Sequence, residues 1–183
     1  EDLAVGFAVL CHDMGKPLTT EVVDGRIRSN GHETAGLKPA RKFLESLNVS
    51  AKLTDIILPL IKCHMRPAVL FSGQSSTAAI RRLSRDCGRM DLLLRVFQAD
   101  AAGRPPLPDD SKAAVEWITK QAREMNIERS KPKSLLNGDD LLKRGWKSGP
   151  KMGEFLAHAY EAQLDGAFTD RPSALLWLDN QSA

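Results

Sequence analysis

The chain has no apolar run long enough to cross a membrane, few cysteines, and no large excess of charge of either sign. A membrane-spanning helix needs about 20 consecutive apolar residues, and no signal peptide opens the sequence, so we expect no membrane partner. The three cysteines, Cys11, Cys63 and Cys87, are too few for a disulfide framework and favour a reduced, cytoplasmic setting. We interpret Cys11 and Cys63 as small buried residues, although each precedes a histidine and could bind a metal.

The net charge of +3 does not by itself indicate a nucleic-acid partner, but the positive charge is concentrated in one segment. Residues 129–151, the basic strip, hold seven basic side chains against two acidic ones. A glycine-bearing turn at 145–151 could present backbone N–H groups and lysines to phosphates. The alternative is that the strip is a solvated face. The candidate RNA-binding residues are Lys131, Lys133, Lys143, Arg144, Lys147 and Lys151.

Helical patterns dominate the sequence, which has no repeat, no low-complexity run and no alternating series of strands. Capping residues and apolar spacing predict helices near 3–14, 33–47, 51–65, 77–87, 91–102 and 109–127, then two short helices and a last one near 173–178. The segment VVDGRI at 22–27 predicts a tight turn or small hairpin. We therefore expect an all-α fold, a helical bundle with a small C-terminal helical module and at most one tiny β-hairpin.

A rigid break at 103–108, Gly-Arg-Pro-Pro-Leu-Pro, is the best internal boundary. We expect a metal-binding helical domain over 1–104 and a helical module over 105–183. The chain begins at Glu1 without an initiator methionine and inside a helical pattern, which suggests a piece of a longer protein.

The stretch LCHDMGKP places His12 and Asp13 together at the end of an apolar helix, which Gly15 and Pro17 are expected to stop. An imidazole and a carboxylate at one helix end can converge on a divalent metal ion. The apolar residues that recur at helical spacing, and so predict one buried face, are Leu3, Phe7, Leu10 and Met14.

Further candidate ligands stand at other predicted helix ends or breaks. His32 lies in GHETAG, His64 precedes Arg-Pro, and Asp100 lies in QADAAGR. One histidine in such a place is more often a hydrogen-bonded cap, but five ligands from five helical segments favour a shared metal site. Imidazole with carboxylate suits zinc, manganese, iron, nickel or cobalt. The candidate set is His12, Asp13, His32, His64 and Asp100.

These motifs resemble a known family. His-Asp followed by Gly-Lys, then GHE-x-x-G, a later histidine and an aspartate in an AD-x-x-GR context are similar to the HD superfamily of metal-dependent phosphohydrolases. Within it, the likeness is to the HD domain of bacterial CCA-adding tRNA nucleotidyltransferases and their poly(A) polymerase-like relatives. The tail LLNGDDLLKRGWKSGPKMGEFLAHAYEAQLDG resembles the C-terminal module of those enzymes, and the motifs together span residues 3–178.

The resemblance implies a divalent metal cofactor held by His12, Asp13 and Asp100, with nickel, manganese, magnesium, cobalt and zinc all open. It also implies that His32 and His64 contact a second metal or a substrate phosphate. Either histidine could protonate a leaving oxygen, because histidine titrates near neutral pH.

Two cations complete the implied site. Lys16 follows the His-Asp pair and could steady a phosphate or Asp13, so the implied catalytic residues are Asp13, Lys16, His32 and His64. Arg104 is a second candidate for phosphate binding, with an exposed loop arginine as the alternative.

The implied function is a metal-dependent phosphohydrolase of phosphatase or 2′,3′-cyclic phosphodiesterase type that acts on nucleotide or RNA phosphates. The alternative is a non-catalytic module that binds RNA or mediates self-association in a tRNA nucleotidyltransferase or poly(A) polymerase family protein, with tRNA as the parent's partner. The family uses a further metal-binding histidine well before the His-Asp pair, and this sequence does not contain it. The sequence also has no nucleotidyltransferase head, so we expect no nucleotide addition. The sequence does not predict the oligomeric state.

Overall fold

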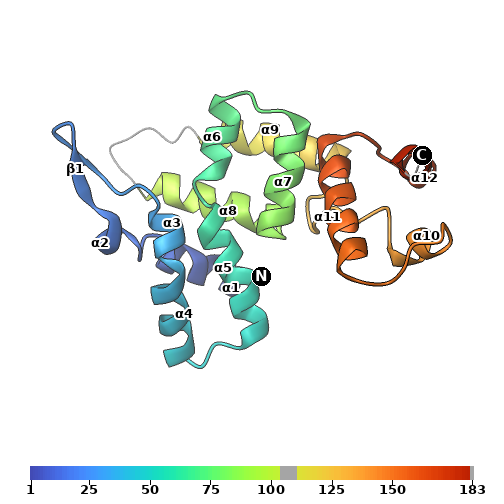
Figure 1. Ribbon diagram of the computed structural model, residues 1–183. Helices are drawn as coiled ribbons and strands as arrows, with labels where there is room; N and C mark the ends of the chain where they lie inside the picture. Colours follow the sequence, from blue (N-terminus) through green and yellow to red (C-terminus); the bar gives the residue numbers. More distant parts are fainter. Residues whose placement is uncertain (104–110, 182–183) are drawn as a thin grey trace. The chain divides into compact units, whose positions relative to one another are not determined.

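The structure, a computed structural model, describes residues 1–103 and 111–181 (Figure 1). The chain forms two compact units, Glu1–Lys131 and Pro132–Ala183, each with its own buried apolar cluster. The boundary between the units therefore lies at 131/132 rather than at the expected 104/105. The reason is that helix α9 (Ser111–Glu124) packs against α6, α7 and α8 of the first unit.

Helix α1 (Asp2–Cys11) buries a face of small side chains where it contacts α5 and α8. Ala4, Ala8 and Cys11 are at most 1% exposed, whereas Leu3 and Leu10 are 68% and 61% exposed. The predicted buried face through Leu3 and Leu10 was therefore wrong. Small side chains let helix axes approach closely, so contact with two helices favours the alanine face.

The predicted β-hairpin is present. A turn at 12–15 and the short helix α2 (Lys16–Thr19) lead into β1 (Glu21–Val23) and β2 (Arg26–Arg28), which pair antiparallel with Val22 opposite Ile27. Asp24 and Gly25 have φ of 52° and 71°, the positive values that a tight two-residue hairpin turn requires. Figure 1 shows this hairpin extending away from the neighbouring helices.

Helix α5 (Ala51–Cys63) is the centre of the first unit, since it contacts α1, α3, α4, α7 and α8. Its first turn is capped by Ser50, and Pro59 lies inside it. Before it, α3 (His32–Ala35) and α4 (Leu37–Ser46) replace the single helix predicted over 33–47, because Gly36 separates them.

The remaining helices of the first unit are α6 (Arg66–Ser72), α7 (Thr77–Cys87) and α8 (Met90–Ala102). The sequence predicted no helix over 66–76, where α6 lies, whereas α7 occupies its predicted range and is capped by Ser76. The buried Ser84 hydroxyl on α7 donates to the Ile127 carbonyl at 2.9 Å, which ties α7 to the segment after α9. The largest fully buried side chains of this unit are Leu44, Ile57, Leu60, Ile61, Ile80, Leu83, Met90, Leu92, Leu93 and Ile118.

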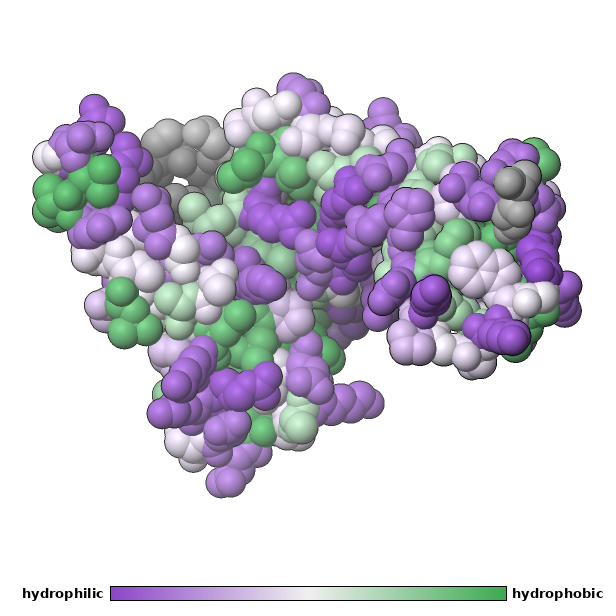
Figure 2. Space-filling view, in the orientation of Figure 1, coloured by the Kyte–Doolittle hydropathy of each residue, from purple (hydrophilic) through white to green (hydrophobic). Residues whose placement is uncertain are grey.

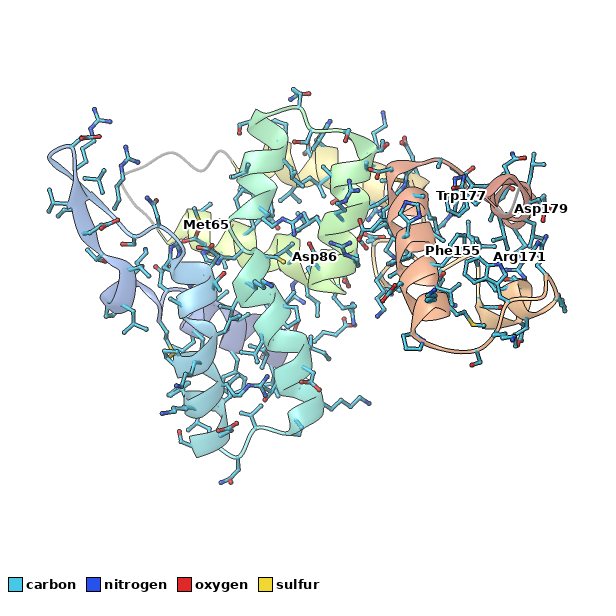
Figure 3. All side chains as sticks on the ribbon, viewed as in Figure 1. Met65, Asp86, Phe155, Arg171, Trp177 and Asp179 are labelled. Atoms are coloured by element: carbon cyan, nitrogen blue, oxygen red, sulfur yellow. The ribbon has the colours of Figure 1, made fainter. Side chains whose placement is uncertain are left out.

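The second unit contains α10 (Gly138–Leu142), α11 (Pro150–Asp165) and α12 (Arg171–Gln181). Aromatic rings pack against its buried cluster. Phe155 lies 4.7 Å from Trp146 and 6.0 Å from Trp177, and the buried Phe168 lies 5.2 Å from Trp177, measured between ring centroids. Figure 3 labels Phe155 and Trp177. Trp146 and Trp177 are thus partly buried packing residues of this unit.

The all-α prediction is confirmed, since the strands of the described residues form a single two-stranded sheet. Within the described ranges, we find no helix with the length and apolar character needed to cross a membrane.

Candidate metal centre

Three histidines of the first unit share one local arrangement. His12 and His64 stand at the C-caps of α1 and α5, and His32 is the first residue of α3. In each, Nδ1 lies 2.7–2.8 Å from the backbone carbonyl three residues earlier, that of Val9, Ile61 or Ser29. A carbonyl oxygen only accepts, so Nδ1 carries the proton and Nε2 of the neutral ring presents a lone pair.

The histidine Nε2 atoms and two carboxylates converge on one point. Nε2 of His12 lies 3.2 Å from Oδ2 of Asp13 and 3.3 Å from Oδ1 of Asp100. Nε2 of His32 lies 3.4 Å from Oδ1 of Asp13 and 3.3 Å from Nε2 of His64. One ligand atom from each of His12, Asp13 and His64 fits within a span of 4.8 Å. All five side chains selected from the sequence therefore come together.

The electrostatics of the cluster call for a positive charge between its members. The lone pairs of His32 and His64 face each other, because both Nδ1 atoms donate to the backbone. Nε2 of His12 likewise faces two carboxylates. Acceptors held this close repel one another unless a proton or a cation lies between them. Imidazole nitrogen and carboxylate oxygen are ligands of divalent transition metals, so the donor set fits the cofactor expected from the sequence.

The pKa shifts of His12 and His64 follow from the contacts of these two side chains. The hydrogen bond to Asp100 raises the pKa of His12 above its ordinary value, although burial acts in the opposite direction. Burial lowers the pKa of His64, which is 1% exposed. His64 is thus held as the neutral imidazole, the form that binds metals.

A contact between two glycines brings His32 to the His-Asp turn. A Cβ added to Gly15 would lie 2.0 Å from the His32 carbonyl oxygen and 2.6 Å from the Gly36 nitrogen. The Gly36 N–H in turn donates to that same carbonyl at 2.8 Å. The backbones of the turn and of α3 therefore approach as closely as only glycine allows.

A cavity of about 800 Å³ adjoins the cluster. It is lined by residues from α2, β2, α3, α5, α6, α7 and α8, including Lys16, His32 and Asp100. Nζ of Lys16 also donates to Oδ2 of Asp13 at 2.6 Å, and its side chain is 49% exposed. Lys16 thus lies at the edge of the cluster, within reach of both Asp13 and a ligand in the cavity.

Arg104 lies outside the described residues. The three cysteines are free and buried, and burial raises the pKa of each thiol, that of Cys87 to about 12. A thiol that keeps its proton is a poor metal ligand, which supports the interpretation of Cys11 and Cys63 as packing residues.

The basic strip is divided between the two units, with Lys131 in the first and the other five candidates in the second. Arg144 is bound within its unit, since its Nε donates to Asp179 at 2.6 Å and its Nη1 to the Asp140 carbonyl at 3.1 Å (Figure 3). The remaining candidates, all exposed, are Lys131, Lys133, Lys143, Lys147 and Lys151.

Sequence reasoning missed the walls of the cavity. Ile27, Met65, Arg66, Val69 and Asp86 all line it, and none was a candidate site residue. The Arg-Pro pair after His64 was the available signal, because proline near a helix N-terminus indicates a new helix, here α6.

An all-α fold in which three histidines and two aspartates form one connected cluster defines a protein with a candidate metal centre. The chain is 37% identical over 116 residues to the Multifunctional CCA protein of Laribacter hongkongensis, a match that covers 60% of this chain and 27% of that protein. It is 31% identical over 136 residues to the Multifunctional CCA protein of Actinobacillus pleuropneumoniae, covering 68% of this chain and 32% of that protein. The protein of the same name from Haemophilus influenzae is 27% identical over 135 residues, a match that covers 69% of this chain and 32% of that protein.

The chain thus spans about a third or less of the length of these relatives, 27–32%. No protein-family model and no solved structure matches it.

Proposed function

We propose that the first unit is a metal-dependent phosphohydrolase domain, of phosphatase or cyclic phosphodiesterase type, in a tRNA nucleotidyltransferase-like protein. The observation that carries the proposal is that one ligand atom from each of His12, Asp13 and His64 fits within a span of 4.8 Å, with Oδ1 of Asp100 3.3 Å from Nε2 of His12. The Nε2 atom of His12, with the two nearby carboxylates, completes a donor set that suits a divalent cation. The resemblance to Multifunctional CCA proteins supports the assignment to RNA-related phosphates.

His12, Asp13, His64 and Asp100 would hold the metal in this proposal. The ion would supply Lewis-acid activation of water and of a phosphoryl oxygen. Lys16 holds Asp13 in place and offers its partly exposed ammonium group to a phosphate in the cavity. His32 lines the cavity while His64 does not, so His32, once protonated at Nε2, is the better placed of the two to donate that proton to a leaving oxygen.

Asp13→Ala tests the proposal. We expect loss of bound metal and a fall of more than about 100-fold in hydrolysis of 2′,3′-cyclic nucleotides, since changes to outer partners of metal ligands alone cost 10- to 100-fold. The measurements are elemental analysis of protein purified without chelator and initial rates with added nickel, manganese, cobalt, zinc or magnesium.

Asp55→Ala is the matched control, because Asp55 is exposed on α5 and lies outside the cluster and the cavity lining. It should keep wild-type metal content and rate. Wild-type protein that binds none of these metals and hydrolyses no phosphate ester with any of them contradicts the proposal.

A second candidate function, RNA binding by the second unit, is favoured by the exposure of Lys143, Lys147 and Lys151 around the turn between α10 and α11. Gly145 and Gly149 in that turn have φ of 82° and 158°, values that favour glycine, and neither residue has a side chain to cover its backbone N–H. Exposed lysines beside an open backbone turn suit a phosphate backbone.

Reversing the charge of Lys143, Lys147 and Lys151 to glutamate should weaken tRNA binding and flatten its salt dependence, since each lost phosphate contact lowers the slope of log K against log salt by about 0.7–0.9. Filter binding at several salt concentrations measures this. Arg144 is left unchanged because it holds α10 to α12. The control reverses three exposed lysines of the first unit, Lys38, Lys42 and Lys52. An equal loss of affinity in both triple variants would refute a specific RNA site on the second unit.

A further inference from the structure

Three large apolar side chains line the cavity beside the metal centre and are exposed in it. Ile27 on β2 is 78% exposed, Met65 before α6 is 43% exposed, and Val69 on α6 is 63% exposed. We name these three residues the apolar rim. Figure 2 shows apolar surface on the hairpin and over α6, with hydrophilic residues beside both. Single exposed apolar residues are ordinary, but three that share one cavity indicate a binding surface.

A fixed guanidinium lies in the same cavity wall. Nη1 of Arg66 donates to Oδ2 of Asp86 at 2.6 Å, and Oδ1 of Asp86 accepts from Nε of Arg85 at 2.8 Å. Figure 3 shows Met65 where α5 passes into α6 and Asp86 on α7. Asp86 holds the planar guanidinium group of Arg66 in place. The Arg66 side chain is 34% exposed and lines the cavity, so this group can still contact a ligand there. Such a group stacks on aromatic rings and binds their polar edges.

The cavity is of the size and chemistry of a small-molecule site. Its volume of about 800 Å³ falls within the range of ~300–1,000 Å³ that ligand pockets occupy. The phosphate would lie toward the metal centre and Lys16, which leaves the rest of the ligand against the apolar rim. An aliphatic chain there would bury Arg66, Asp86 and Glu33 against groups that cannot hydrogen-bond. A nucleobase offers apolar faces together with polar edges.

We infer that the apolar rim and Arg66 form the base-binding subsite of the phosphohydrolase centre, with the nucleobase against Ile27, Met65 and Val69. The inference rests on the proposed function, because the metal centre fixes the phosphate end of the ligand. It makes the substrate a nucleotide or a nucleotide at an RNA end rather than a small sugar phosphate.

The test compares two substrates that differ only in the base, a nucleoside 5′-monophosphate and ribose 5-phosphate, in Ile27→Ser and Val69→Ser. For the nucleotide, we expect KM to rise about tenfold in each variant, because each removes one buried aliphatic contact. Calorimetric binding of the same nucleotide should weaken by the same factor. KM for ribose 5-phosphate and kcat for both substrates should stay within about twofold.

Val22→Ser is the matched control for the hairpin, since Val22 pairs with Ile27 across the strands, is 71% exposed, and does not line the cavity. It should behave as wild type with both substrates. If KM rises equally for the nucleotide and for ribose 5-phosphate in Ile27→Ser and Val69→Ser, the base subsite is overturned while the proposed hydrolysis stands. Wild-type protein that turns over ribose 5-phosphate as efficiently as the nucleotide would overturn it as well. Wild-type protein that binds no divalent metal and hydrolyses no phosphate ester, 2′,3′-cyclic nucleotides included, would instead refute the proposed function, and the inference with it.

Discussion

At the scale of single residues, the histidines of the metal centre show how a helix end prepares a ligand. The last carbonyls of a helix have no intrahelical partner, so a histidine just beyond them finds an acceptor for Nδ1. His12 and His64 use the carbonyls of Val9 and Ile61 in this way, and each directs Nε2 into the cluster. Their positions at helix ends were predictable from sequence. The 3.3 Å approach of His32 to His64 was not, because it joins residues from two different helices.

Asp140 holds the second unit together at a single point. Its side chain is 4% exposed, forms two hydrogen bonds with the Arg171 guanidinium, and accepts the Asn137 N–H at 2.8 Å. Burial alone would raise the pKa of Asp140, but Arg171 and the Asn137 N–H outweigh it and lower this pKa. The carboxylate therefore stabilises the unit above the ordinary aspartate pKa of about 3.9, and this stabilisation is lost as the pH falls through the lowered value.

Asp140→Asn should lower the free energy of unfolding of the second unit by about 1–3 kcal/mol at pH 7, because Arg171 loses a buried charged partner. The difference from wild type should shrink as the pH falls below the ordinary aspartate pKa and through the lowered pKa of Asp140, because the wild-type carboxyl then becomes neutral as well. Urea unfolding followed by the fluorescence of Trp146 and Trp177 measures it. A difference that stays constant from pH 7 to pH 2 would show that the charge has no role.

At the scale of elements, the contact between the His-Asp turn and α3 depends on two glycines. Gly15 and Gly36 belong to the motifs that suggested the metal site, but nothing local indicates that their backbones touch. The close approach places the start of α3, and with it His32, beside Asp13. Packing between elements also explains why the predicted buried face of α1 was wrong. Helical periodicity favoured the face with Leu3 and Leu10, but contact with α5 and α8 buries the face with Ala4 and Ala8 instead.

Gly15→Ala should destabilise the first unit by about 1–3 kcal/mol, because the new Cβ meets backbone atoms that must move. It should also weaken metal binding, since the same shift moves the turn that carries His12 and Asp13, two of the residues that would hold the metal. Thermal unfolding and metal titration measure the two effects.

Gly6→Ala is the control, because a Cβ at Gly6 on α1 has no neighbour within 4 Å. It should leave metal binding unchanged and stabilise the unit by up to about 1 kcal/mol through better helix propensity. Equal stability of Gly15→Ala and Gly6→Ala would mean that the backbone contact is not needed.

At the scale of the whole molecule, each unit has its own buried cluster, and the candidate metal centre lies within the first. Helices α1, α5 and α8 carry His12, His64 and Asp100, and the three helices contact one another in pairs. The core of the first unit thus sets the distances between the ligands.

Leu93→Ala tests this dependence, because Leu93 is fully buried on α8. It should cost about 2–5 kcal/mol of stability, whereas Leu93→Met should cost less than about 1.5 kcal/mol because it nearly conserves volume. Urea unfolding followed by circular dichroism measures both values. Leu93→Ala should also weaken metal binding more than Leu93→Met does. Equal costs for the two variants would show that this part of the core tolerates a void.

The sequence by itself determined the helical class, the hairpin at Asp24-Gly25, the cap at Ser76, and the positions of His12 and His64 at helix ends. These follow from hydrogen bonds and backbone preferences within a few residues, which a local pattern records. The tertiary structure decided which face of α1 is buried, that the unit boundary follows Lys131, and that a cavity with an apolar rim adjoins the metal centre. Those features arise from packing between residues far apart in the chain, and packing selects among faces and contacts that the local pattern leaves equivalent.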